Sequence, residues 1–136
     1  MALNYKTYFV LFCLFYFICF IFGYASITRF DPTLVPHMDD TMYYINVVKN
    51  GLNFSSDDPR YTRFIIPMIA HYVYKYVTFW TFDSAITSLL VVNSIFVSLT
   101  ALALIHICKI LELKKEVLIA SLFFFFTNFT IINTYL

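Results

Sequence analysis

Two adjacent carboxylates and a tyrosine pair form the most distinctive polar pattern of the chain. The pattern reads Asp39-Asp40-Thr41-Met42-Tyr43-Tyr44, hereafter the acidic motif. One carboxylate can cap a following helix. The other would then be free to accept a proton as a general base or to bind a divalent metal such as Mg²⁺ or Mn²⁺. His37, two residues before the motif, is a candidate third metal ligand. The plainer interpretation, in which both aspartates are only helix caps, stays open.

Two arginines later in the same segment could recognise phosphate. Arg60 and Arg63 are three residues apart and would share one face of a helix. The planar guanidinium fork matches phosphate oxygens, and beside a membrane that phosphate could belong to a lipid. The alternatives are that the arginines extend toward lipid headgroups or pair with Asp57 and Asp58.

The composition places these residues in an integral membrane protein. Of the 136 residues, 61% are hydrophobic and 12% are charged, whereas a soluble domain has about half and about a quarter. This balance excludes a soluble enzyme, a nucleic-acid-binding protein and a disordered tail. The three cysteines lie in apolar stretches without zinc-site spacing, so we interpret them as packing residues: Cys13, Cys19 and Cys108.

Three apolar stretches are long enough to cross a bilayer, which takes roughly 20 residues. They cover residues 7–28, 84–108 and 117–136. Lipid offers no hydrogen-bond partner to an open strand edge, so all three must be helices. The sequence therefore predicts an all-α, polytopic membrane protein that forms a single membrane domain over 1–136. It would have three to four transmembrane helices, with short interfacial helices in the first outer loop.

The apolar stretch 64–82 is the ambiguous fourth segment. As a full span it would place Lys75 at mid-depth, which is costly in lipid. Pro67 lies near its start, where helices accept proline. Its many tyrosines and Trp80 favour the membrane interface. We therefore expect an interfacial or partly inserted helix over 64–82 rather than a full span.

The outer loop over 29–83 carries most of the polar residues, and a second short helix is predicted within it. Over 40–50, Tyr44, Ile45 and Val48 fall on one face, with polar residues opposite. Gly51 is a suitable stop signal. This amphipathic helix would lie along the membrane surface.

The distribution of lysine and arginine predicts the orientation. With a cytoplasmic N-terminus, Lys6 and the cluster Lys109, Lys114 and Lys115 lie inside, and the aspartate-rich loop 29–83 lies outside. An alternative is that the first stretch is a cleaved signal peptide, although its apolar run is longer than usual. His106, near the end of the second span, is expected to hydrogen-bond to a neighbouring helix or to lie at the inner interface.

The order of these features resembles the N-terminal part of GT-C class integral membrane glycosyltransferases. Bacterial members carry a D-G-x-x-Y-Y element, followed by a Y-x-x-R element with apolar residues, proline and alanine. The acidic motif corresponds to the first element, with Asp40 where the family often has glycine. The second element reads Tyr61-Thr62-Arg63-Phe64-Ile65-Ile66-Pro67-Met68-Ile69-Ala70, preceded by Asp58-Pro59-Arg60.

The resemblance implies transfer of a sugar from a polyprenyl-phosphate donor to an envelope glycan, lipid or protein acceptor. The reaction would take place on the outer face of the bacterial cytoplasmic membrane. By position, Asp39 or Asp40 would act as base or metal ligand. Arg63 first, and Arg60 second, would hold the donor phosphate.

Members of this class are several times longer than this chain. We therefore expect it to be an N-terminal fragment that is inactive in isolation. Two alternatives stay open. One is a small non-catalytic membrane protein or accessory subunit that assembles with other membrane subunits. The other is the N-terminal part of a polysaccharide polymerase or transporter.

Overall fold

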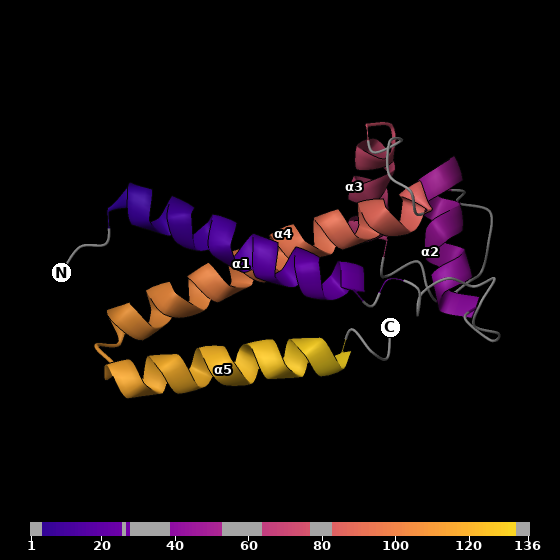
Figure 1. Cartoon of the computed structure of the whole chain (residues 1–136). Coiled ribbons are helices and arrows are strands. Elements are labelled where there is room, and N and C mark those ends of the chain that lie inside the picture. Colours follow the sequence, from indigo (N-terminus) through magenta and orange to yellow (C-terminus); the bar gives the residue numbers. More distant parts are fainter. Residues whose placement is uncertain (1–3, 26, 28–38, 53–63, 77–82, 133–136) are drawn as a thin grey trace. The chain divides into compact units, whose positions relative to one another are not determined.

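The described part of the chain is entirely helical. The computed structural model describes residues 4–25, 27, 39–52, 64–76 and 83–132, with the backbone alone at 39, 40 and 128–132. Within these ranges there are five helices and no strand: α1 (Tyr5–Ala25), α2 (Asp39–Asn50), α3 (Ile65–Tyr74), α4 (Ser84–Ile110) and α5 (Lys115–Ile132) (Figure 1). They form two packed units. The first combines Met1–Phe22 with Ser94–Tyr135, and the second is Gly23–Asn93.

Two of the described helices, α1 and α4, are long and apolar enough to cross a membrane. With 21 and 27 residues, both reach the roughly 20 residues that a bilayer core requires. Helix α1 covers residues 7–25 of the stretch expected at 7–28, and α4 covers all of the stretch expected at 84–108. The third expected span, 117–136, overlaps α5, of which the structure describes 115–132. That α5 spans a membrane therefore stays a prediction.

Small and hydroxyl-bearing residues make up much of the buried face of α4. Ala85, Thr87, Ser88, Ser98 and Ala101 are all fully buried. Three hydroxyls donate to the carbonyl oxygen one turn earlier: Thr87 to Asp83, Ser88 to Ser84 and Ser98 to Ser94. These bonds satisfy the hydroxyls inside α4, so a neighbouring helix can approach closely without leaving a buried polar group unpaired.

In the first unit, α1, α4 and α5 share an apolar core. Phe15 of α1 is buried with Ala101 and Ile105 of α4. Its ring lies 5.2 Å from that of Phe126 in α5, measured between centroids. The Tyr8 hydroxyl and Nδ1 of His106 form a hydrogen bond of 3.1 Å, which confirms the interhelical bond predicted for His106. Contacts between side chains far apart in sequence thus join the three helices.

In the second unit, the end of α1 meets the start of α4 at a position without a side chain. A Cβ on Gly23 would overlap Cδ1 of Leu90. Glycine therefore leaves room for the Leu90 side chain, and Leu90 packs against the core that Ile27, Val48 and Ala85 help to form.

Helix α3 is shorter than the helix expected over 64–82. It ends at Tyr74, Lys75 and Tyr76 form a turn, and residues 77–82 lie outside the described part. Ten residues rise only about 15 Å, half of a bilayer core. Pro67 is buried in the first helical turn, where its missing N–H removes no intrahelical bond.

A tight turn joins α4 to α5. The amide of Leu113 donates to the Cys108 carbonyl and that of Glu112 to the Lys109 carbonyl, at 3.0 and 3.1 Å. This is the Schellman pattern, which requires a left-handed residue after the helix. Glu112 fills that position with φ of 51°. A left-handed conformation costs an L-residue roughly 1–2 kcal/mol, so the turn is strained at Glu112.

Replacing Glu112 with glycine should therefore stabilise the chain. The greater freedom of glycine in the unfolded state cancels part of the gain, which leaves about 0.5–1 kcal/mol. Thermal unfolding in detergent micelles would show the increase as a higher midpoint. Glu112→Ala is the matched control, because it removes the same carboxylate but keeps the Cβ. Equal midpoints for the two variants would mean that the turn stores no such strain.

Candidate functional site

The acidic motif begins α2. Asp39 and Asp40 are the first two residues of this helix. A carboxylate in the first turn is favoured by the partial positive charge at a helix N-terminus. The Tyr43 and Tyr44 rings that complete the motif lie edge to face, with centroids 5.7 Å apart. The motif thus lies at the start of one helix. The side chains of Asp39 and Asp40 lie outside the described part of the structure.

Helix α2 is amphipathic and packs against α3. Thr41, Ile45 and Val48 are buried, whereas Asn46 and Lys49 are exposed. The helix ends at Asn50, and Gly51 follows with φ of 78°, a left-handed value that glycine adopts without strain. That α2 lies along a membrane surface stays a prediction.

A hydrogen bond from His71 connects α3 to the last turns of α2. Nδ1 of this histidine lies 2.7 Å from the carbonyl oxygen of Val48, which is itself fully buried. Since a carbonyl oxygen only accepts, Nδ1 must carry the proton and donate it. This bond satisfies a carbonyl near the end of α2, where intrahelical partners run out.

Asp83 fastens α2 to the start of α4 through two different bonds. One carboxylate oxygen accepts a hydrogen bond from the Ala85 amide at 2.7 Å, which makes Asp83 the N-cap of α4. The other lies 2.9 Å from Nζ of Lys49 on α2. The acidic motif therefore stands at the start of a helix whose other end is tied to both α3 and α4.

The same contacts set the charge state of Asp83. Partial burial alone would raise the pKa of its carboxyl group, but this effect is outweighed. Hydrogen bonds from Lys49 and the Ala85 amide, together with the Lys49 charge, hold the pKa below its ordinary value. The carboxylate is therefore ionised throughout the neutral range.

The remaining predicted site residues lie outside the described part of the chain: His37, Arg60 and Arg63. Among the described residues, no group of three or more His, Cys, Asp or Glu could hold a metal ion. The side chains of the proposed metal ligands lie outside the described part of the chain: Asp39, Asp40 and His37. The structure therefore leaves the metal site and the phosphate site as predictions.

The residues that position α2 were not among the predicted site residues: Lys49, His71 and Asp83. A signal for Asp83 was present, because an aspartate directly before an apolar run is a typical N-cap. Its pairing with Lys49, 34 residues earlier in the chain, had no local signal.

No protein-family model matches this chain, and neither the curated proteins nor the solved structures contain a match to it.

The Asp83 carboxylate should make stability depend on acidity. Because its folded pKa is lowered, its contribution is complete above the unfolded value of about 3.9 and is lost as the pH falls through the folded value. The side chains of Lys49 and Asp83 are 41% and 34% exposed. Screening by solvent therefore limits the ion pair to about 0.5–1 kcal/mol.

Thermal unfolding in detergent from about pH 6 to about pH 3 would measure this contribution. Asp83→Asn keeps a capping side chain but removes the charge, so its deficit against the unaltered chain should shrink toward acid pH. Lys49→Gln should behave alike, whereas Asp83→Ala should lose about 1 kcal/mol more through the cap. A constant deficit for Asp83→Asn at every pH would contradict this assignment.

Proposed function

We propose that this chain is the N-terminal part of an integral membrane glycosyltransferase of the GT-C class. It would move a sugar from a polyprenyl-phosphate donor to an envelope glycan, lipid or protein acceptor. The observation that supports this proposal best is the position of the acidic motif. The motif begins a short helix that is fastened to the start of α4, a candidate membrane span.

The surface of α1 supports a membrane location. Phe9, Phe17 and Phe22 are more than half exposed along this helix. Contiguous apolar surface of this kind is unfavourable in water, whereas hydrocarbon chains would cover it at no cost. We place the N-terminus in the cytoplasm and the loop 29–83 on the outer face of a bacterial cytoplasmic membrane, on the basis of the lysine and arginine distribution.

The proposed chemistry assigns separate tasks to the two polar groups of the loop. Asp39 or Asp40 accepts the proton of an acceptor hydroxyl, or holds a divalent metal that does part of this work. Arg63, with Arg60, binds the phosphate of the donor and stabilises the negative charge on the leaving group. The attachment of α2 to α4 would keep the motif close to the membrane surface, where the headgroup of a lipid-linked sugar lies.

Substituting the motif aspartates should abolish transfer. We expect Asp39→Asn or Asp40→Asn to lower sugar transfer by about 10²–10⁴-fold, because a positioned base contributes that much. The assay would use membranes from cells that express the gene from its start codon to its own stop codon. A polyprenyl-phosphate sugar would be the donor. Asp57→Asn is the matched control, since it makes the same change in the same loop outside the motif.

Two outcomes would contradict the proposal. Full activity in both variants would remove the catalytic assignment. Loss of the protein from the membrane, with no activity in the unaltered gene product, would favour a non-catalytic membrane subunit in which both aspartates are helix caps.

Removal of metal ions by a chelator distinguishes the two roles proposed for the aspartates, general base and metal ligand. If a metal bound by Asp39, Asp40 or His37 takes part, EDTA should abolish transfer and Mg²⁺ or Mn²⁺ should restore it. His37→Ala should then raise the metal concentration needed for half-maximal transfer by roughly 10–100-fold, the usual loss of affinity when a metal site loses a supporting residue. Transfer that is indifferent to EDTA would assign the aspartate as a base alone.

A further inference from the structure

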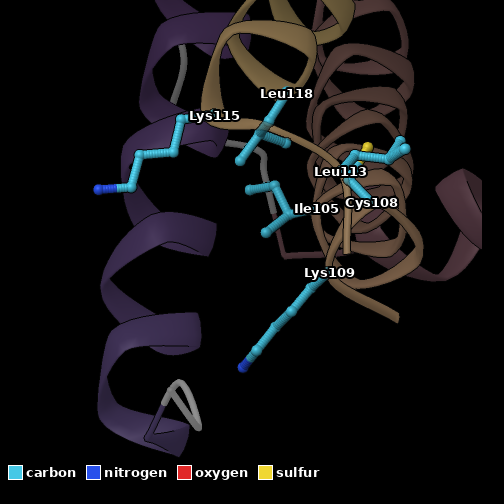
Figure 2. A pocket seen from close by; sticks show the side chains of 6 residues that line it. All are labelled: Ile105, Cys108, Lys109, Leu113, Lys115 and Leu118. Atoms are coloured by element: carbon cyan, nitrogen blue, oxygen red, sulfur yellow. The ribbon is translucent and has the colours of Figure 1, made fainter. Parts of the chain in front are cut away.

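A small, half-open cavity lies beside the α4–α5 turn, and the proposed function does not use it. The cavity has a volume of about 150 Å³ and is lined by Ile105, Cys108, Lys109, Leu113, Lys115 and Leu118 (Figure 2). All six residues belong to the first unit. The Schellman bonds bring Leu113 back toward the last turn of α4, and Leu113 and Cys108 both line the cavity.

The inner wall of the cavity is apolar. Ile105 and Cys108 are buried, and Leu113 and Leu118 add aliphatic surface. An apolar cavity of about this size can hold a group as large as benzene. The cavity could therefore accept the first carbons of an acyl chain.

The rim of the cavity is cationic. Lys109 lies in the last turn of α4, and Lys115 is the first residue of α5. Both side chains are exposed, and in Figure 2 both ammonium groups extend away from the apolar lining. The neighbouring acidic residues Glu112 and Glu116 are not part of the lining. Two cations beside an apolar cavity form a surface complementary to an anionic amphiphile.

We propose that this cavity binds an anionic phospholipid. The lipid phosphate would pair with the ammonium groups at the rim, from Lys109 and Lys115, and the start of one acyl chain would enter the cavity. The end of α4, a candidate membrane span, is where headgroups and acyl chains meet. Zwitterionic lipids should bind more weakly because they carry no net negative charge. A free phosphate should also bind more weakly, because it leaves the apolar wall of the cavity in contact with water.

The lipid site does not depend on the proposed glycosyl transfer. The acidic motif belongs to the second unit, whereas the cavity belongs to the first. Failure of either proposal therefore leaves the other intact.

Native mass spectrometry of the purified chain in neutral detergent would test the site. The probes are phosphatidylglycerol, phosphatidylcholine and glycerol 1-phosphate, titrated at fixed ionic strength. We expect phosphatidylglycerol to bind at least tenfold more tightly than the other two. Equal affinity for phosphatidylcholine would overturn the role of the lysines. Equal affinity for glycerol 1-phosphate would overturn the role of the apolar cavity.

Charge removal gives the second arm of the test. A lysine near an anionic lipid surface contributes about fivefold in affinity, so Lys109→Gln with Lys115→Gln should weaken phosphatidylglycerol binding roughly 25-fold. Lys114→Gln is the matched control, because it removes the same charge from the same turn but from a residue outside the lining. An equal loss in the control would show diffuse attraction rather than a site.

If the double lysine variant loses its helical circular dichroism, it has not folded and cannot test the site. A second variant that keeps every charge is then used instead. Leu113→Trp enlarges a half-exposed lining residue and should fill the cavity, which we expect to lower phosphatidylglycerol affinity at least fivefold. Unchanged affinity in Leu113→Trp would show that no acyl chain enters the cavity, and would overturn the proposal.

Discussion

The packing of both units depends on the small, internally satisfied face of α4. Its first ten residues belong to the second unit and the rest to the first. At Thr87, Ser88 and Ser98 the buried hydroxyls donate to carbonyl oxygens of the same helix or of its N-cap, so no partner from another helix is needed. Larger side chains here would hold α1 and the loop helices away, and unpaired hydroxyls would destabilise the contact. Helix α4 therefore gives both units a surface of small side chains whose buried hydroxyls are already hydrogen-bonded.

Polar contacts then determine where the loop helices attach to that surface. Apolar contacts between α2, α3 and α4 are not directional, whereas the Lys49–Asp83 pair and the His71–Val48 bond each require one geometry. Asp83 is central because one carboxylate both caps α4 and pairs with α2. The start of α2, and the acidic motif with it, is thus connected through a single helix to a fixed end of a candidate membrane span.

The two ends of α4 carry opposite charges that suit its dipole. A carboxylate caps the N-terminus and Lys109 lies in the last turn, which is the arrangement that the helix macrodipole favours at each end. The proposed sugar transfer and the proposed lipid site use these two ends separately.

Composition and local pattern sufficed for the helical class, for the apolar runs of α1 and α4, and for a helix that ends before Gly51, because these features depend on neighbouring residues alone. The catalytic assignment of Asp39 and Asp40 came from motif order and remains a prediction. Folding in three dimensions decided the rest. In the structure α3 ends at Tyr74, Lys49 pairs with Asp83, and Leu113 returns to Cys108 beside a half-open cavity. A long-range pair such as Lys49–Asp83 depends on which surfaces meet, and a one-dimensional pattern carries no signal of that meeting.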